Sequence, residues 1–196
     1  SKDMEFTIWA ALAARVAHHL ERDEVAGIVI THGTDTLEET AYLLQRLLAP
    51  AKPVVLTAAM RPATALLRDG PQNLLDAVTL VRNGHVPGVS VVVAGRAWAG
   101  ADVRKVHTYR LDAFDGGDAG PTALIEDGQV RVLCTRPAHD DGLGIATLAR
   151  AASAWPRVEI VLNHAGADGR IVDALLAQKV DGLVAAGTGN GALSAA

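Results

Sequence analysis

Three short and almost purely apolar runs, at residues 25–30, 54–57 and 89–94, recur along the first half of this sequence. Strands that are buried on both faces of a sheet have this composition, because neither face needs polar side chains. The stretches that precede and follow the first run show a helical repeat, with apolar residues about every four positions. Alternation of strands and helices at this spacing predicts right-handed βαβ units and a parallel sheet. The two helical stripes are Ile8, Leu12, Val16 and Leu20, and Leu37, Ala41, Leu44 and Leu48.

The fold class that we expect is α/β, with a doubly wound and mostly parallel sheet in a large domain. Pro71 follows Asp69 and Gly70, which is typical of the first turn of a third helix. Beyond residue 94 the pattern changes, and the Gly- and Asp-rich residues 109–121 are expected to form a loop. The Asp127-Gly128 pair before an apolar run at 129–134 predicts an antiparallel hairpin that ends the sheet.

A second and smaller α/β domain is expected after a polar linker. Residues 136–156 form this linker, and the large domain covers residues 1–135. The strand–helix alternation then restarts over residues 157–196, with strands at 158–162 and 180–185 around a helix at 170–178. Two strands and one helix bury little core. We therefore expect both domains to be incomplete in this chain.

Charge and cysteine content narrow the function classes. The 18 basic and 22 acidic residues give a net charge of −4, which argues against a nucleic-acid groove and against an anionic membrane surface as the main partner. The single cysteine, Cys134, excludes an internal disulfide and a cysteine-based zinc site. No apolar run approaches the ~18 residues of a membrane-spanning helix.

Polar residues follow the first predicted strand, where open parallel sheets bind their ligands. Thr34 offers a hydroxyl and Asp35 a carboxylate, beside the free N–H groups of a helix start. These groups suit a zwitterionic small molecule and a developing oxyanion. Gly33 permits a tight turn with positive φ, and Thr36 with Glu39 has the spacing of a capping box. The alternative is that these residues only cap the helix.

Lys105 follows the third predicted strand, and we expect it to approach Thr34 and Asp35 in space. A partly buried lysine beside a hydroxyl can accept a proton, with a carboxylate to orient it. The alternative is a solvated surface lysine. A third hypothesis, a nucleotide-binding protein, depends only on the Gly-rich turn at residues 187–191. This turn lacks the Lys-Ser/Thr pair of a P-loop.

Several segments share a pattern with one known family. Residues 27–37 match its second signature, and residues 57–62 with 69–73 are similar to its "GAMRP…DGPxN" segment. Lys105, followed by Thr108 and Phe114, matches its lysine segment. Residues 187–191 are similar to its "GxGNG" turn, and residues 1–4 to its "SxDM" segment. Together these segments resemble the bacterial-type L-asparaginase/glutaminase family over essentially the whole chain.

The resemblance implies hydrolysis of the side-chain amide of L-asparagine, and to a varying extent of glutamine, with release of ammonia and without a metal or cofactor. It implies a threonine-based mechanism in which Thr34, Lys105 and Asp35 form a triad. Ser1 would contact the α-carboxylate of the substrate and Asp35 its α-ammonium group. The backbone of Gly33 and Ala59 would line the pocket. The resemblance also implies a homo-oligomer, a dimer of dimers whose sites are completed by a neighbouring subunit.

The sequence departs from the family pattern in informative places. The first motif of the family, "TGGTIA", carries the primary nucleophilic threonine and is followed by a mobile loop with a tyrosine; neither occurs here. We expect both to precede Ser1 and the rest of the small domain to follow Ala196, so that residues 1–196 alone should be inactive. Lys2 stands where many members have glutamine. Gly166 stands where periplasmic members have an asparagine that reaches the neighbouring site, which leaves the preference for asparagine or glutamine open.

An alternative hypothesis is that a protein with this fold does not hydrolyse free amino-acid amides. The chain could bind an amino acid without hydrolysis, or serve as the amidase-like subunit of a tRNA-dependent amidotransferase. The acidic net charge disfavours the tRNA role, because nucleic-acid affinity depends on basic groups that neutralise phosphates. The lone cysteine and the lack of a leader in the sequence predict a cytoplasmic protein, with a periplasmic one as the alternative.

Overall fold

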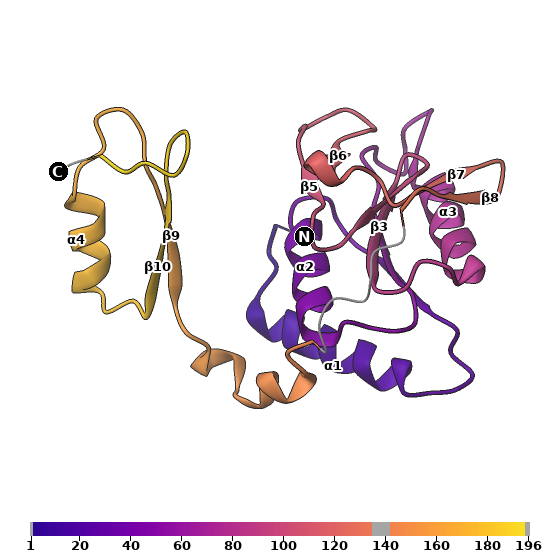
Figure 1. Cartoon of the computed structure of the whole chain (residues 1–196), viewed down its shortest axis with the longest axis horizontal. Helices are drawn as coiled ribbons and strands as arrows, with labels where there is room; N and C mark the ends of the chain where they lie inside the picture. Colours follow the sequence, from indigo (N-terminus) through magenta and orange to yellow (C-terminus); the bar gives the residue numbers. More distant parts are fainter. Residues whose placement is uncertain (1, 135–141, 195–196) are drawn as a thin grey trace. The chain divides into compact units, whose positions relative to one another are not determined.

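The computed structural model describes residues 2–134 and 142–194 and divides the chain into two compact units, residues 1–149 and 150–196 (Figure 1). The domain limits expected from the sequence, and the linker over residues 136–156, stay predictions, since residues 135–141 lie outside the described part of the chain.

The first unit is built on a six-stranded sheet with the strand order β1-β2-β3-β4-β7-β8. The first three strands are parallel, and β4, β7 and β8 continue the sheet in antiparallel fashion. The α/β class is therefore confirmed, with the parallel pairing in the part that the apolar runs predicted. The strands are β1 (Ile28–Thr31), β2 (Val54–Thr57), β3 (Val89–Val93), β4 (Arg96–Ala99), β7 (Ala123–Glu126) and β8 (Gln129–Val132).

Helices cover both faces of this sheet, as expected for a doubly wound fold. Figure 1 shows α2 and α3 on opposite sides of β3. Val54 and Leu56 of β2 belong to the core that α1 and α2 cover, whereas Val55 belongs to the core under α3. This is the period of two of a strand that is buried on both faces. The helices are α1 (Phe6–Leu20), α2 (Leu37–Leu48) and α3 (Gly70–Asn83).

The helix starts were predicted better than their caps. Pro71 lies in the first turn of α3, as its position indicated. Thr36 is the N-cap residue of α2, but its side chain makes no capping hydrogen bond, so the expected capping box is wrong. Gly33 is not among the glycines with positive φ, and the turn that it permits is made with an ordinary backbone conformation.

The region after β3 is more ordered than the sequence indicated. The expected loop over residues 109–121 contains a short strand, β6 (Phe114–Asp115), and a 3₁₀ helix, η1 (Gly117–Ala119). Strand β6 pairs with β5 (Arg104–Lys105) in an antiparallel ladder of two residues each. The Gly- and Asp-rich composition of this segment predicts a loop and not a strand. Strands this short form because of tertiary contacts rather than because of the propensities of their residues. The final hairpin, β7–β8 with its Asp127-Gly128 turn, is confirmed.

The second unit is a single βαβ arrangement, with β9 (Val158–Leu162), α4 (Arg170–Ala177) and β10 (Gly182–Ala186). The two strands are parallel, as the restarted alternation predicted. Its apolar side chains are poorly covered, and Ile160 is 70% exposed. Within residues 2–134 and 142–194, no helix has both the length and the hydropathy to cross a membrane, and no three His, Cys, Asp or Glu side chains gather as metal ligands.

Candidate functional site

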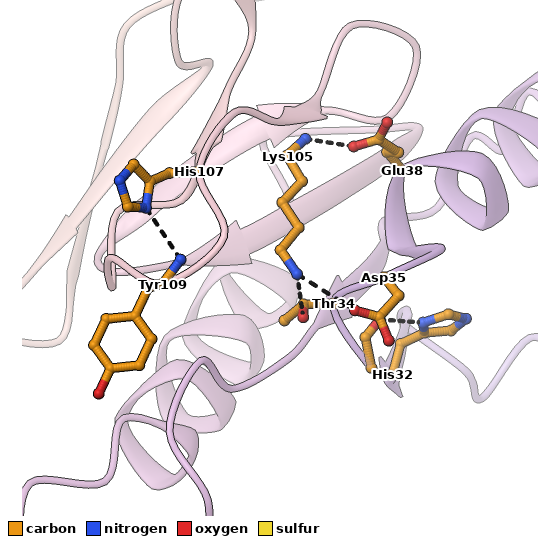
Figure 2. A network of polar contacts seen from close by, with 8 residues as sticks. His32, Thr34, Asp35, Glu38, Lys105, His107 and Tyr109 are labelled. Carbon is orange, nitrogen blue, oxygen red and sulfur yellow. Dashed lines mark hydrogen bonds and ion pairs between the residues drawn. The ribbon is translucent and has the colours of Figure 1, made fainter. Parts of the chain in front are cut away.

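Thr34, Asp35 and Lys105 meet at the edge of the first unit's sheet where β1 ends (Figure 2). The ammonium group of Lys105, Nζ, lies 2.9 Å from Thr34 Oγ1 and 3.4 Å from Asp35 Oδ1. The Lys105 side chain is 20% exposed and that of Asp35 is 56% exposed. Lys105 is therefore held inward over the hydroxyl rather than solvated at the surface, while the carboxylate faces solvent. The three side chains form a hydroxyl–amine–carboxylate cluster.

Two separate segments build this cluster. Thr34 and Asp35 lie in the short connection between β1 and α2, and 71 positions separate Thr34 from Lys105 in the chain. Lys105 comes from β5, where it pairs with Phe114 of β6. Its backbone N–H donates a hydrogen bond to the Glu38 carboxylate in the first turn of α2. The helix that follows Thr34 thus also contacts the backbone of the lysine.

A second network lies beneath the Thr34 loop. The carbonyl of Gly33 can only accept, so the His32 Nδ1 that lies 2.7 Å from it carries the proton. In the neutral ring, Nε2 is then an acceptor. The Thr40 hydroxyl lies 3.1 Å from this nitrogen and 3.1 Å from the carbonyl of Thr36, four residues earlier, and its one proton can go to either acceptor. Thr40 in turn accepts the indole N–H of Trp9 at 2.8 Å. This network was missed from the sequence, because a histidine next to a glycine has no distinguishing pattern.

The loop after β2 is fixed from α3. The Asp69 carboxylate accepts the backbone N–H groups of Met60 at 2.8 Å and Arg61 at 2.9 Å. Ala59, predicted to line the pocket, is exposed in this loop. Strands β1 and β2 end on the paired residues Thr31 and Thr57. Gly33 and Ala59 therefore each lie two residues beyond the same rung of the sheet, at one edge.

The segment that follows Lys105 is tied to the same loop. The Arg61 guanidinium donates to the carbonyl of Tyr109 at 2.7 Å and lies 4.2 Å from the centre of its ring. The His107 Nδ1 accepts the backbone N–H groups of Tyr109 and Arg110 at 3.0 and 3.1 Å; Figure 2 shows the first of these contacts. The β2 loop and the lysine segment are thus joined by an arginine–tyrosine contact next to the cluster.

Ser1 and the Gly-rich turn at residues 187–191 were also singled out from the sequence. Ser1 lies outside the described residues. The Gly-rich turn at 187–191 belongs to the second unit, where a side chain at Gly187 would meet the backbone of Gly191 at 2.5 Å. This close approach of two backbone segments accounts for a glycine there without any phosphate.

A cavity of about 980 Å³ lies between α2 and the segments at residues 100–104 and 116–119. Its lining includes Glu38 but not Thr34, Asp35 or Lys105. The Thr34–Asp35–Lys105 cluster therefore does not line this cavity, and the distances among its three side chains define the candidate site.

Comparisons with known proteins show which family the sequence resembles. Residues 1–138 match the family model "Asparaginase, N-terminal". The chain is 37% identical over 198 residues to L-asparaginase 2 of Escherichia coli, covering 98% of this chain and 55% of that protein. It is 35% identical over 188 residues to the glutaminase-asparaginase of Pseudomonas fluorescens, covering 93% and 51%.

The fold is also similar to that of a solved L-asparaginase structure. The probable cytoplasmic L-asparaginase of Campylobacter jejuni is similar with a TM-score of 0.89 and 35% identity, over 99% of this chain and 62% of that one. The chain spans about half the length of the curated relatives it matches.

Proposed function

Because this chain belongs to the asparaginase family, we propose that its full-length protein hydrolyses the side-chain amide of L-asparagine to L-aspartate and ammonia. The observation that carries the proposal is the 2.9 Å contact between Lys105 Nζ and Thr34 Oγ1, beside the Asp35 carboxylate. Amide hydrolysis needs a nucleophile, a group that moves protons and a site for the oxyanion. The cluster supplies the second requirement directly.

The proposed chemistry follows from the donor and acceptor properties of the three groups. With a neutral amine, the Thr34 hydroxyl passes its proton to Lys105 Nζ and can in turn take the proton of the nucleophilic threonine, which the family resemblance places in a motif that residues 1–196 lack. Attack of that threonine oxygen on the amide carbon forms the C–O bond of an acyl–enzyme ester. The proton on Nζ goes to the leaving nitrogen, which departs as ammonia as the C–N bond breaks. Water then hydrolyses the ester to L-aspartate and restores the threonine hydroxyl. Asp35 lies 3.4 Å from Nζ and keeps the lysine oriented. Its exposed carboxylate also suits the α-ammonium group of an amino-acid substrate.

L-Glutamine, whose side-chain amide is one methylene farther from the α-carbon, is a second possible substrate. The Pseudomonas fluorescens relative is named for both amides, and we propose a side activity on L-glutamine. Steady-state ammonia release from each amide by the full-length protein measures the ratio of the two kcat/KM values. Release from neither amide would refute the proposed hydrolysis.

Replacement of the lysine tests the mechanism. Lys105→Met keeps the length of the side chain but removes its amine, and ammonia release should fall to background while the melting temperature stays close to that of the parent. Lys52→Met is the matched control, since Lys52 Nζ binds the carbonyls of Leu20 and Arg22, away from Thr34. Unchanged turnover by the Lys105 variant would contradict its assigned role.

A second candidate function is amino-acid binding without hydrolysis, which the same carboxylate and helix start would support. Calorimetry with L-aspartate, run beside the ammonia assay, separates the two. Binding without turnover of asparagine or glutamine would favour the second function.

We further propose a homo-oligomer, a dimer of dimers, in the cytoplasm. The name of the Campylobacter jejuni protein supports the location. Light scattering on the full-length protein tests the assembly, and a monomer would contradict it. Cell fractionation tests the location.

A further inference from the structure

We propose that Glu38 is a positioning residue that places Lys105 over Thr34; this inference rests on the proposed function of that cluster. Strand β5 has only two residues, and a ladder this short is not stable by itself. Something outside the ladder must hold the backbone of Lys105 if Nζ is to stay within 2.9 Å of the hydroxyl.

The pairing of β5 leaves one backbone donor on its outer side. Val106 donates its N–H to the carbonyl of Ala113 at 2.8 Å, on the side of β6. Successive N–H groups of a strand point in opposite directions, so the N–H of Lys105 points away from β6. The Glu38 carboxylate accepts this N–H. Glu38 thus takes the place of a second neighbouring strand.

Glu38 occupies a rigid position close in sequence to the hydroxyl that Lys105 must reach. Thr34 precedes it by four residues, and Leu37 anchors the start of α2 with no exposed surface. Lys105 is therefore attached at two points to one segment, through its backbone N–H at Glu38 and its ammonium group at Thr34. The flexible four-carbon stem of a lysine does not fix the position of Nζ by itself, but two attachment points do.

The chemistry of Glu38 suits this task. An ionised carboxylate makes a stronger hydrogen bond to a backbone N–H than a neutral acceptor does, and a carboxylate in the first turn of a helix is favoured by the helix dipole. The neighbouring Glu39 is exposed, and no contact of its carboxylate is found in the described part of the chain. Two consecutive glutamates on one turn therefore differ in whether they hold the lysine backbone.

Three variants of the full-length protein test the proposal. In Glu38→Ala the acceptor is lost, and kcat for ammonia release should fall roughly 100-fold, as expected for a catalytic group displaced by ~1 Å, with KM little changed. In Glu38→Gln the amide oxygen can accept the same N–H, so kcat should recover to within about fivefold of the parent, since a neutral acceptor still bonds. Glu39→Ala is the matched control and should behave as the parent does.

Hydrogen exchange of the peptide that contains Lys105, followed by mass spectrometry, gives a readout that does not depend on activity. Exchange should be faster in Glu38→Ala than in Glu38→Gln, Glu39→Ala and the parent, while melting temperatures and exchange elsewhere stay similar. Parent-like exchange in Glu38→Ala, or a kcat of Glu38→Gln as low as that of Glu38→Ala, would overturn the proposal. If the parent releases no ammonia, the proposed function fails, and the exchange comparison still decides the role of Glu38.

Discussion

The side-chain carbonyl of Asn73 accepts the backbone N–H of Ala94 at 3.0 Å, from a position that is 2% exposed. The amide group of the same side chain donates to the carbonyl of Ala58 at 2.8 Å. One buried residue of α3 therefore joins the segments that follow β2 and β3, two neighbouring strands at the candidate site. Both ends of the amide are used, which restricts it to one orientation.

Replacement of Asn73 should be costly. Asn73→Ala leaves two backbone groups without their partners, and each unsatisfied buried group costs about 1–3 kcal/mol. We expect the free energy of unfolding to fall by about 3 kcal/mol, measured by urea denaturation. Leu75→Ala, on the exposed side of the same helix, is the control and should change it by less than about 1 kcal/mol. Similar losses for the two variants would contradict this account of Asn73.

Ala94 has the left-handed backbone conformation, with φ of 52°. A non-glycine residue pays roughly 1–2 kcal/mol there, whereas glycine loses about 0.4–1 kcal/mol through the greater freedom of its unfolded chain. Ala94→Gly should therefore raise the free energy of unfolding by about 0.5 kcal/mol. The control is Ala97→Gly inside β4, which should lower it, because glycine weakens a strand interior. A clear loss of stability in Ala94→Gly would show that its backbone is not strained.

Thr40 is fully buried and its hydroxyl accepts from Trp9. Thr40→Val has nearly the same shape but leaves the Trp9 indole N–H and the His32 ring without this partner. We expect a loss of about 1–3 kcal/mol in the free energy of unfolding. Thr79 also donates its hydroxyl to the carbonyl four residues earlier, but on an exposed helix face. Thr79→Val should thus be close to neutral, and an equal effect at both positions would refute a specific role of Thr40.

Asp76 should make stability depend on pH. Burial raises the pKa of its carboxyl group, and the hydrogen bond from Gln72 lowers the pKa by a smaller amount. The folded-state pKa thus lies above the unfolded one, so the folded protein binds the proton more tightly. The contribution of Asp76 to stability is fully present below the unfolded pKa and is lost as pH rises through the folded pKa.

Asp76→Asn removes this dependence. The variant should be more stable than the parent at about pH 7 and nearly equal to it at about pH 3, where both side chains are neutral. Thermal melts at the two pH values measure the difference, and Asp118→Asn on the exposed η1 turn is the control. A gain that is as large at the acidic pH would contradict the assigned cause.

Two hairpins show how far the sequence predicts this fold. Asp127 and Gly128, with φ of 50° and 71°, form a two-residue turn, and an Asp-Gly pair between two strands predicts such a turn. Ala94 and Gly95 turn with φ of 52° and 71°, and join β3 to β4 in the same way. Alanine rarely has this conformation, so the second hairpin was not predicted. The tertiary hydrogen bond from Ala94 to Asn73 favours the turn where local propensity does not.

The residues of the candidate site likewise include some that the sequence predicts and some that it does not. Thr34 and Asp35 were predicted from the end of an apolar strand, because a parallel sheet brings its ligands there. The contact of Lys105 with them was inferred with a solvated lysine as the alternative, and the short ladder that holds it was missed. The part played by Glu38 could not be predicted, since it depends on the direction of one backbone N–H. Regular patterns give the scaffold, and contacts between distant segments complete the site.

The separation of 71 positions between Thr34 and Lys105 has a consequence during protein synthesis. At translation rates of about 5–20 residues per second, several seconds pass between the emergence of the hydroxyl and that of the amine. Throughout this interval the nascent chain contains Thr34 and Asp35 of the candidate cluster but not Lys105. The contact between Thr34 and Lys105 can therefore form only after the lysine and its partner strand β6 have also been synthesised.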